Sequence, residues 1–277
     1  MEKRPYSLPR DAIETKRLDI QADIYDQNIG YLINPKIADS IPKDAAVADV
    51  ACGTGTWTLK VASKPYQCYG LDMSSDQFPK SPPANCTFGT LNLLNEIPQE
   101  MQSRFDVVHM RLLVVGLTGD DWHTAAANAF KMLKPGGWLQ WCESNFEDMN
   151  ALQAESGAST ISMRALLQTM MGEARNHGKF CGDVGRLFET VQAAGFQQCG
   201  EDIVSSDRVP STRADATVVE HQAMAKVCKT MADQGNAGSE SRSKTDKLVQ
   251  QCEAEIAGGK TYWRWNIHTV IGQKPRS

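Results

Sequence analysis

One short segment limits the folds open to this chain more than any other. Residues 45–52, AAVADVAC, form an apolar run that predicts a buried strand, and Gly53-Thr54-Gly55 follows at once. Residues 56–63 then have the composition of a helix. A glycine turn between a strand and a helix lets the backbone approach a ligand, and the helix start offers unpaired N–H groups. The segment therefore predicts an α/β domain with a ligand site at this turn.

The alternation of strand and helix continues along the chain. The sequence predicts a helix over 121–133, which the run Lys134-Pro135-Gly136-Gly137 ends. Another helix is expected over 183–196. The other predicted strands are 66–73, 86–93, 105–113, 138–144, 200–207 and 261–275. Strands that alternate with helices predict a mostly parallel sheet covered by helices on both faces.

The two flanks of this pattern are expected to be helical. Residues 11–36 predict a helix, and 211–257 predict one long helix or a pair, with a break at the polar run 233–239. Residues that recur at helical spacing give the first helix one face with both apolar and amide side chains, which we call its mixed face: Leu18, Gln21, Tyr25, Asn28 and Leu32. Amides on such a face need a polar partner, which is either a bound ligand or solvent.

The residues around the glycine turn select among nucleotide ligands. A dinucleotide fingerprint needs a third glycine where Thr58 stands, and the lysine of a phosphate-binding loop is missing. Asp49 lies before the turn and would repel a pyrophosphate. Asp72 ends the next strand, where a carboxylate can accept both hydroxyls of a ribose. A ribonucleoside with an ammonium and a sulfonium group, S-adenosylmethionine (SAM), fits these charges.

Composition excludes several classes of protein. With 29 basic and 33 acidic residues among 277, the net charge is −4, which argues against a nucleic-acid-binding protein. No apolar stretch is long enough to span a bilayer, and the charged start lacks the apolar core of a signal peptide. The cysteines form no CxxC pair, so we expect no metal site and a cytoplasmic protein.

Several ordered motifs together resemble a known family. VADVACGTGTW resembles the first motif of class I SAM-dependent methyltransferases, and YGLDMS, FDVVHMRLL, LKPGGWL and AAGF continue the resemblance over about residues 46–205. Ala51 departs from the usual glycine, which implies tighter packing against the methionine part of SAM. ETKRLDIQ, HMR and QWCE resemble fungal UbiE-type methyltransferases of secondary metabolism. That group includes the gliotoxin S-methyltransferase type and relatives of global regulators.

The resemblance implies an architecture and a SAM site. It implies an α/β, Rossmann-like fold with a seven-stranded, mostly parallel sheet. We expect residues 1–36 to form a helical lid and 37–277 the methyltransferase domain, with helical cap insertions near 150–180 and 211–257. The residues expected to contact SAM are Asp49, Ala51, Gly53, Gly55, Asp72, Met73, Asn92, Leu93, His109 and Tyr25. Asn92 is equally consistent with an ordinary turn, and His109 with a core histidine.

A second group of residues is expected at the acceptor. Arg111 is expected to bind a carboxylate or a backbone carbonyl, and Glu143 is its possible partner or a substrate contact. For both residues a purely structural ion pair is the alternative to substrate binding. Met163 and Met170 suit either a flexible substrate wall or the core of a cap helix. The expected reaction is methyl transfer to S, O or N of a small molecule. A thiol needs no base, whereas a hydroxyl does, with His109, Glu143 and His268 as candidates.

Three other functions remain open at this point. A methyltransferase-like protein can bind SAM and a regulatory protein partner with little turnover. The same fold can also run a reaction other than methylation. An NAD-dependent oxidoreductase is disfavoured by Thr58 and Asp49.

Overall fold

The computed structural model describes residues 11–179, 182–234 and 239–276. Within these ranges seven strands form one sheet in the order β3-β2-β1-β4-β5-β7-β6. Strands β1 to β5 pair in parallel, and β7 runs antiparallel to both β5 and β6. The strands are β1 Ala46–Val50, β2 Gln67–Asp72, β3 Cys86–Thr90, β4 Phe105–Arg111, β5 Leu133–Gln153, β6 Gln197–Ser205 and β7 Thr261–Gln273.

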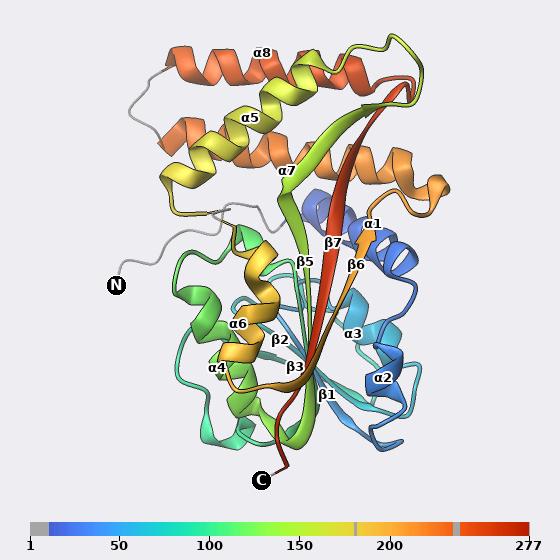
Figure 1. Cartoon of the computed structure of the whole chain (residues 1–277), viewed down its shortest axis with the longest axis vertical. Coiled ribbons are helices and arrows are strands. Elements are labelled where there is room, and N and C mark those ends of the chain that lie inside the picture. The colour runs from blue at the N-terminus through green and yellow to red at the C-terminus, as the bar shows by residue number, and fades with distance from the viewer. Residues whose placement is uncertain (1–10, 180–181, 235–238, 277) are drawn as a thin grey trace.

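Helices cover both faces of this sheet (Figure 1). On one face α2 and α3 bury Ile37, Trp57 and Val61 against β1, β4 and neighbouring strands. On the other face α4 and α6 close the larger core. The helices are α1 Ala12–Ile29, α2 Pro35–Ala38, α3 Thr56–Val61, α4 Asp121–Met132, α5 Ile161–Asn176, α6 Leu187–Ala193, α7 Arg213–Gln234 and α8 Ser239–Ile256. The predicted Rossmann-like α/β class is confirmed.

The first helix is shorter than the expected segment 11–36. Asp11 caps it by accepting N–H groups from Ile13 and Glu14, at 3.0 and 2.9 Å. Gly30 ends it in the left-handed conformation, with φ 91°. Asn34 then caps the separate short helix α2 through Lys36 N. The expectation of one continuous helix was therefore wrong beyond residue 29.

Strand β5 differs more in length from the expected element than any other strand. The predicted strand 138–144 extends to Gln153, because residues 150–153 pair with 261–264 of β7 beyond a bulge after Asn145. The expected helical insertion near 150–180 therefore begins as a strand and becomes helical only in α5. Figure 1 shows β5 and β7 rising together out of the sheet toward α5, α7 and α8.

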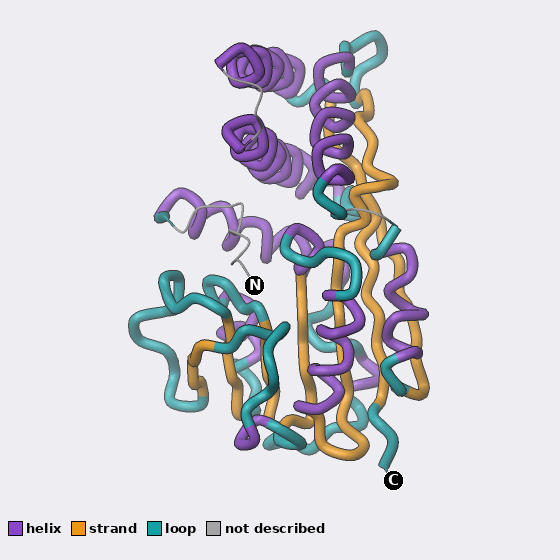
Figure 2. The backbone as a smooth tube through the Cα atoms, turned by 90° about the vertical axis from the view of Figure 1, so that its left-hand side faces the viewer, coloured by secondary structure: helices purple, strands orange, loops and turns teal. Residues whose placement is uncertain are grey.

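Helices α5, α7 and α8 form a cap beyond the sheet, and Figure 2 shows this layer standing above the strands. Its interior is apolar, with Met163, Met170, Met224, Val249 and Cys252 buried. Helix α1 packs against both α7 and α3, so it lies between the cap and the β1 turn. The predicted break at 233–239 falls largely on residues 235–238, which lie outside the described ranges. None of the described helices is long and apolar enough to cross a membrane.

Candidate active site

The turn after β1 follows a backbone path that few side chains tolerate. Ala51, Gly53 and Gly55 have positive φ angles of 61°, 55° and 75°. A Cβ at Gly55 would lie 2.5 Å from the Phe88 ring, so this position requires glycine. Ala51 holds the left-handed conformation with a side chain, which costs about 1–2 kcal/mol. The path of the turn therefore explains both glycines and identifies Ala51 as a strained residue.

Asp72 lies at the end of β2 beside this turn. One carboxylate oxygen accepts the N–H of Gly53 at 3.0 Å, and the other accepts the N–H of Ser74 at 3.1 Å. A carboxylate has about four acceptor positions, so each oxygen keeps room for a further donor. Met73 follows with 57% of its surface exposed. A half-buried carboxylate next to an exposed apolar side chain can hold the hydroxyls of a ribose and contact an attached base.

Asn92 and Leu93 follow β3 at the same end of the sheet. The Asn92 side-chain oxygen accepts the N–H of Leu94 at 3.0 Å, which makes a local turn. Leu93 is buried, and its carbonyl accepts from Asn128 Nδ2 at 2.7 Å. The oxygen expected to meet an adenine amino group thus already has one donor. The adenine contact of these residues stays a prediction.

Asp49 and His109 form a buried pair on adjacent strands. His109 Nδ1 lies 2.9 Å from Asp49 Oδ1, and Thr58 Oγ1 donates to the other oxygen at 2.6 Å. The His109 ring stacks on Trp57, with centroids 3.7 Å apart. Burial lowers the pKa of His109, because it disfavours the charged imidazolium. A neutral, stacked histidine with a carboxylate partner anchors α3 to the sheet, and this placement does not favour a general base.

Arg111 and Glu143 have different partners from those expected. The Arg111 guanidinium donates to Asp26 Oδ1 of α1 at 2.9 Å, so it binds a carboxylate, but not Glu143. Glu143 is fully buried and accepts from Trp141 Nε1 at 2.7 Å and from two backbone N–H groups after β4, at 2.8 and 3.1 Å. Burial raises the pKa of Glu143 to about 7. In this arrangement Glu143 holds the turn after β4, and a substrate contact of Glu143 stays a prediction.

The mixed face of α1 meets polar partners. Asn28 donates to Thr212 Oγ1 at 2.9 Å, and its oxygen accepts the N–H of Val209, so this amide is satisfied by the start of α7. The Tyr25 hydroxyl is hydrogen bonded to Ser144 of β5. Tyr25 is 1% exposed, and burial raises its pKa. A SAM contact by Tyr25 stays a prediction, whereas the partner of Asn28 is now identified within the protein.

The remaining acceptor candidates lie in packed surroundings. Met163 and Met170 are 0% and 3% exposed within the core of the cap, which is the packing alternative considered for them. His268 Nδ1 lies 2.8 Å from Glu201 on the neighbouring strand β6. All three candidate bases therefore have a partner in the structure. A substrate role for the two methionines stays a prediction.

Three aspartates of α1 were not predicted from the sequence. Asp19 accepts from Thr54 and Thr56 of the β1 turn, at 2.9 and 2.6 Å. Asp23 and Asp26 both pair with Lys60 of α3. We call Asp19, Asp23 and Asp26 the acidic row. Their i, i+4, i+7 spacing was the available signal, because it places them on one helix face. The row fixes α1 over the glycine turn.

Comparison with known proteins assigns the family. Residues 47–137 match the family described as a methyltransferase domain. The methyltransferase grgD of Penicillium sp. is 30% identical over 245 residues, which is 82% of each chain. The chain is a class I SAM-dependent methyltransferase. SAM is therefore its methyl donor, as the charges around the glycine turn predicted.

Two further relatives and one solved structure are similar to this methyltransferase. The N-methyltransferase gliN of Aspergillus fumigatus is 26% identical over 72% of this chain and 70% of its own. The secondary metabolism regulator laeA of Monascus pilosus is 30% identical over 72% of this chain and 53% of its own. A chain in the complex of the Haloferax volcanii Trm112 activator with a methyltransferase has a TM-score of 0.55 at 13% identity, covering 99% of this chain and all of that chain. That structure shares the fold.

The residues at the turn fit SAM. A Cβ built on Gly53 would have only Leu18 Cδ1 within 4 Å, at 3.9 Å, so the turn leaves space beneath α1. Asp72 keeps acceptor positions for the hydroxyls of a ribose. Before the turn stands the acidic Asp49, where a phosphate ligand would need a basic or neutral residue. Contacts of Gly53, Asp72 and Met73 with the nucleoside stay predictions.

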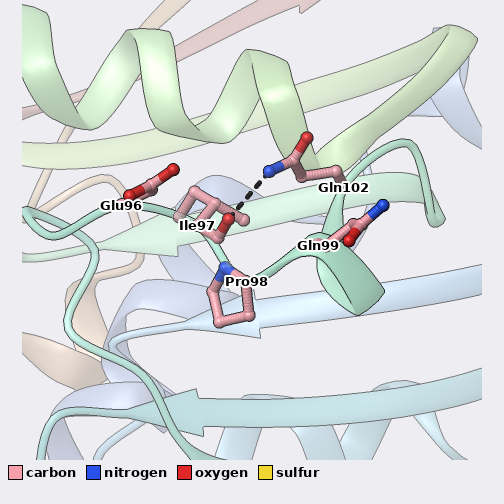
Figure 3. A pocket seen from close by; sticks show the side chains of 5 residues that line it. All are labelled: Glu96, Ile97, Pro98, Gln99 and Gln102. Carbon is pink, nitrogen blue, oxygen red and sulfur yellow. Dashed lines mark hydrogen bonds between the residues drawn. The ribbon is translucent and has the colours of Figure 1, made fainter.

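A different depression lies on the connection between β3 and β4 (Figure 3). Its volume is about 470 Å³, and it is lined by Glu96, Ile97, Pro98, Gln99 and Gln102. These residues come shortly before β4 begins, so they lie toward the amino end of that strand and away from the carboxyl ends of the strands. Ligands of open α/β sheets bind at the carboxyl ends. We therefore assign this depression no part in the SAM site.

Proposed function

We propose that this methyltransferase transfers the methyl group of SAM to a nucleophilic S, O or N atom of a small molecule resembling a secondary metabolite. The observation that carries the proposal is the similarity to methyltransferase grgD across 82% of both chains. The cap supports it, because α5, α7 and α8 stand over the sheet end at which SAM is expected. A covered site of this kind suits a small acceptor better than a protein chain.

The protein's contribution is alignment and exclusion of water. Bound SAM supplies a methyl group on a positively charged sulfur, which is already a strong electrophile. Positioning the acceptor against it can contribute roughly 7–11 kcal/mol. We assign the lid function to residues 1–36, of which 11–36 are described, because the acidic row holds α1 over the glycine turn. A closed lid strengthens the electrostatic contacts beneath it.

Calorimetric titration of the purified chain with SAM, and separately with NADH, tests the donor site. We expect micromolar binding of SAM and no heat with NADH. A panel of small thiols, alcohols and amines incubated with SAM then tests transfer, with mass spectrometry detecting one added methylene unit. Absence of SAM binding, or products without the added mass, would overturn the proposal.

A second function is favoured by one observation, the similarity to the regulator laeA. In that case the chain would bind SAM and a protein partner with little turnover of small molecules. Co-purification from the native source separates the two functions. A stoichiometric protein partner together with no methylated small molecule would support regulation, and methylated product from the isolated chain would exclude it.

A further inference from the structure

Two free cysteines lie side by side at the edge of the sheet. Cys68 of β2 and Cys86 of β3 are register partners in parallel strands. Among the described residues no other two cysteines are paired in this way. Both side chains are buried in the smaller core, so they point to the same face of the sheet. Neighbouring strands lie about 4.8 Å apart, within the Cα–Cα range of about 4.4–6.8 Å that a disulfide spans.

Hydrogen bonds hold the starts of the two strands together around this pair. The N–H of Cys68 donates to the carbonyl oxygen of Asn85 at 2.9 Å. The Asn85 side chain donates from Nδ2 to the carbonyl oxygens of Ala62 and Tyr66, at 3.0 and 3.1 Å. Strand pairing has thus already ordered both cysteines. A bond between their sulfurs would therefore cost little further chain entropy.

The two thiols differ in access and in acidity. Cys86 is 8% exposed on the edge strand β3, whereas Cys68 is 2% exposed on the inner strand β2. Burial, together with the neighbouring Cys86 thiol, raises the pKa of Cys68 to about 12. Burial also raises the pKa of Cys86, but the Cys68 thiol opposes that rise. A small oxidant therefore reaches Cys86 first, and Cys68 is placed to react with the product.

Phe88 connects this pair of cysteines to the glycine turn. It lies two residues beyond Cys86 in β3 and packs against the same core, so the two side chains share one face. A Cβ built on Gly55 of the turn would lie 2.5 Å from Phe88 Cε1, and one built on Gly70 of β2 would lie 2.3 Å from the same atom. The ring therefore occupies the space that side chains at these glycines would fill. A displacement of β3 toward β2 would press this ring on the turn.

We propose that Cys68 and Cys86 form a disulfide when the protein meets a peroxide, and that this bond lowers the affinity for SAM. A disulfide places its sulfur atoms about 2.05 Å apart, closer than unbonded sulfur atoms approach. Its formation draws β3 toward β2, and Phe88 passes the displacement to the glycine turn at which SAM is expected. The inference concerns the methyl donor, so it does not depend on which atom accepts the methyl group.

The oxidation balances with hydrogen peroxide as the oxidant. The Cys86 sulfur attacks one peroxide oxygen and the O–O bond breaks, which forms a sulfenic acid on Cys86 and releases one water. The Cys68 sulfur then attacks the Cys86 sulfur, the S–O bond breaks, and a second water is released. The two thiols lose two electrons and two protons in all. Two molecules of a monothiol such as glutathione reverse the change by thiol–disulfide exchange and become a disulfide themselves.

Peptide mapping tests whether the bond forms. The purified full chain is treated with hydrogen peroxide, its remaining thiols are alkylated, and it is digested with trypsin. Complete digestion places the two cysteines in separate peptides, 61–80 and 81–104, neither of which has another cysteine. We expect mass spectrometry to find these peptides joined, and to find them separate after treatment with dithiothreitol. Recovery of both peptides only in unjoined form would overturn the proposal.

Calorimetry with SAM measures the consequence of the bond. We expect the oxidised chain to bind SAM at least about fivefold more weakly than the reduced chain, and dithiothreitol to restore the affinity. Coupling between two equilibria is reciprocal. In a glutathione redox buffer, saturating SAM should therefore shift the ratio of disulfide to thiol toward the thiol by the same factor. Joined peptides with unchanged SAM affinity would overturn the control of SAM binding.

Cysteine variants locate the effect. Cys86→Ala should lose both the joined peptides and the change in SAM affinity, and Cys68→Ala serves if circular dichroism shows that the first variant is unfolded. Cys199→Ala is the matched control, because it removes a half-buried strand thiol that has no cysteine as register partner, and it should behave as the wild type. A loss of affinity that persists in Cys86→Ala would belong to another oxidised residue, such as Cys52 of the turn or Met73, and would overturn the proposal.

Phe88→Leu tests the route between the cysteine pair and the turn. The smaller side chain leaves space beside Gly55, so the joined peptides should form as before while the change in SAM affinity becomes smaller. An undiminished change would contradict the route through Phe88. Failure of the reduced wild-type chain to bind SAM would contradict the proposed function instead, and peptide mapping would still decide whether the disulfide forms.

Discussion

The sheet region and the cap region differ in how their buried polar groups are satisfied. In the sheet region Asp49, Asp72 and Glu143 each accept hydrogen bonds from the chain itself. Under the cap, Glu220 of α7 is 3% exposed and accepts no hydrogen bond from a described residue. Buried indole N–H groups without partners occur in both regions, at Trp122 and Trp138 as well as at Trp263 and Trp265. The comparison teaches that the carboxylates near the glycine turn are held by local contacts, whereas the carboxylate buried under the cap is not.

The largest effect on SAM affinity is expected from substitution of Asp72 in the sheet region. Asp72→Ala removes the acceptor expected for the ribose hydroxyls and releases the N–H of Gly53. Two lost hydrogen bonds to a charged group should weaken SAM binding at least about 100-fold. Calorimetry measures the change. Unchanged affinity would remove Asp72 from the SAM site.

The next effect compares the two buried glutamates directly. Glu143→Gln should destabilise the fold by about 2 kcal/mol, because an amide offers one accepting oxygen to the three donors, and its NH2 group cannot accept. Glu220→Gln should stabilise it at pH 8 by up to about 3 kcal/mol, because burial disfavours the charged carboxylate that the substitution removes. Urea unfolding measures both. A destabilised Glu220→Gln would show that Arg17 compensates the charge.

The pH dependence of the folding stability follows from Glu143 and Glu220. Burial raises the pKa of each glutamate from 4.5 to about 7, so the folded state binds protons more tightly than the unfolded state. Their contribution to stability is therefore largest below about pH 4.5 and is lost as the pH rises through 7. Glu220→Gln should reduce this decline between pH 5 and 8. An unchanged slope in the same urea experiment would contradict the raised pKa.

A smaller effect concerns the lid. Asp19→Ala removes two hydrogen bonds to Thr54 and Thr56, and we expect SAM to dissociate about fivefold faster, which corresponds to about 1 kcal/mol. Asp23→Ala is the control, because the side chain of Asp23 is 61% exposed and its one ion pair among the described residues is with Lys60. Stopped-flow fluorescence measures both rates. Equal rates in the two variants would contradict the lid role of Asp19.

The smallest effect is at Ala51. Ala51→Gly relieves the left-handed conformation, while glycine also increases the entropy of the unfolded chain. The net stabilisation should be up to about 1 kcal/mol, visible as a higher melting temperature. A lower melting temperature would mean that packing of the Ala51 methyl group outweighs the strain.

Local patterns predicted most of the fold. The strands near the glycine turn have clear apolar runs bounded by turn residues, so their positions followed from the sequence. The extension of β5 did not, because residues 150–153 become a strand only through pairing with β7 more than a hundred residues later. Helix α1 was expected, but its end at Gly30 was missed.

Roles at the site depended on side-chain direction, which the sequence does not contain. His109 lies near a strand end, as predicted, yet its side chain points to the face covered by Trp57. Arg111 was expected to find a carboxylate, and Asp26 of a distant helix provides it. Glu220 gave no signal, because residues 211–257 contain no motif and only the fold buries this carboxylate.

The paired extension of β5 and β7 has a consequence for how such enzymes diversify. The two strands form a stalk that carries the cap helices, with pairing maintained as far as Gln153 and Thr261. Each residue pair contributes about 3.4 Å, and removing one pair would turn the side chains to opposite faces. Removing two pairs keeps the faces and lowers the cap by about 7 Å. Evolution can thus adjust the height of the cap above the sheet through stalk length, leaving the glycine turn untouched.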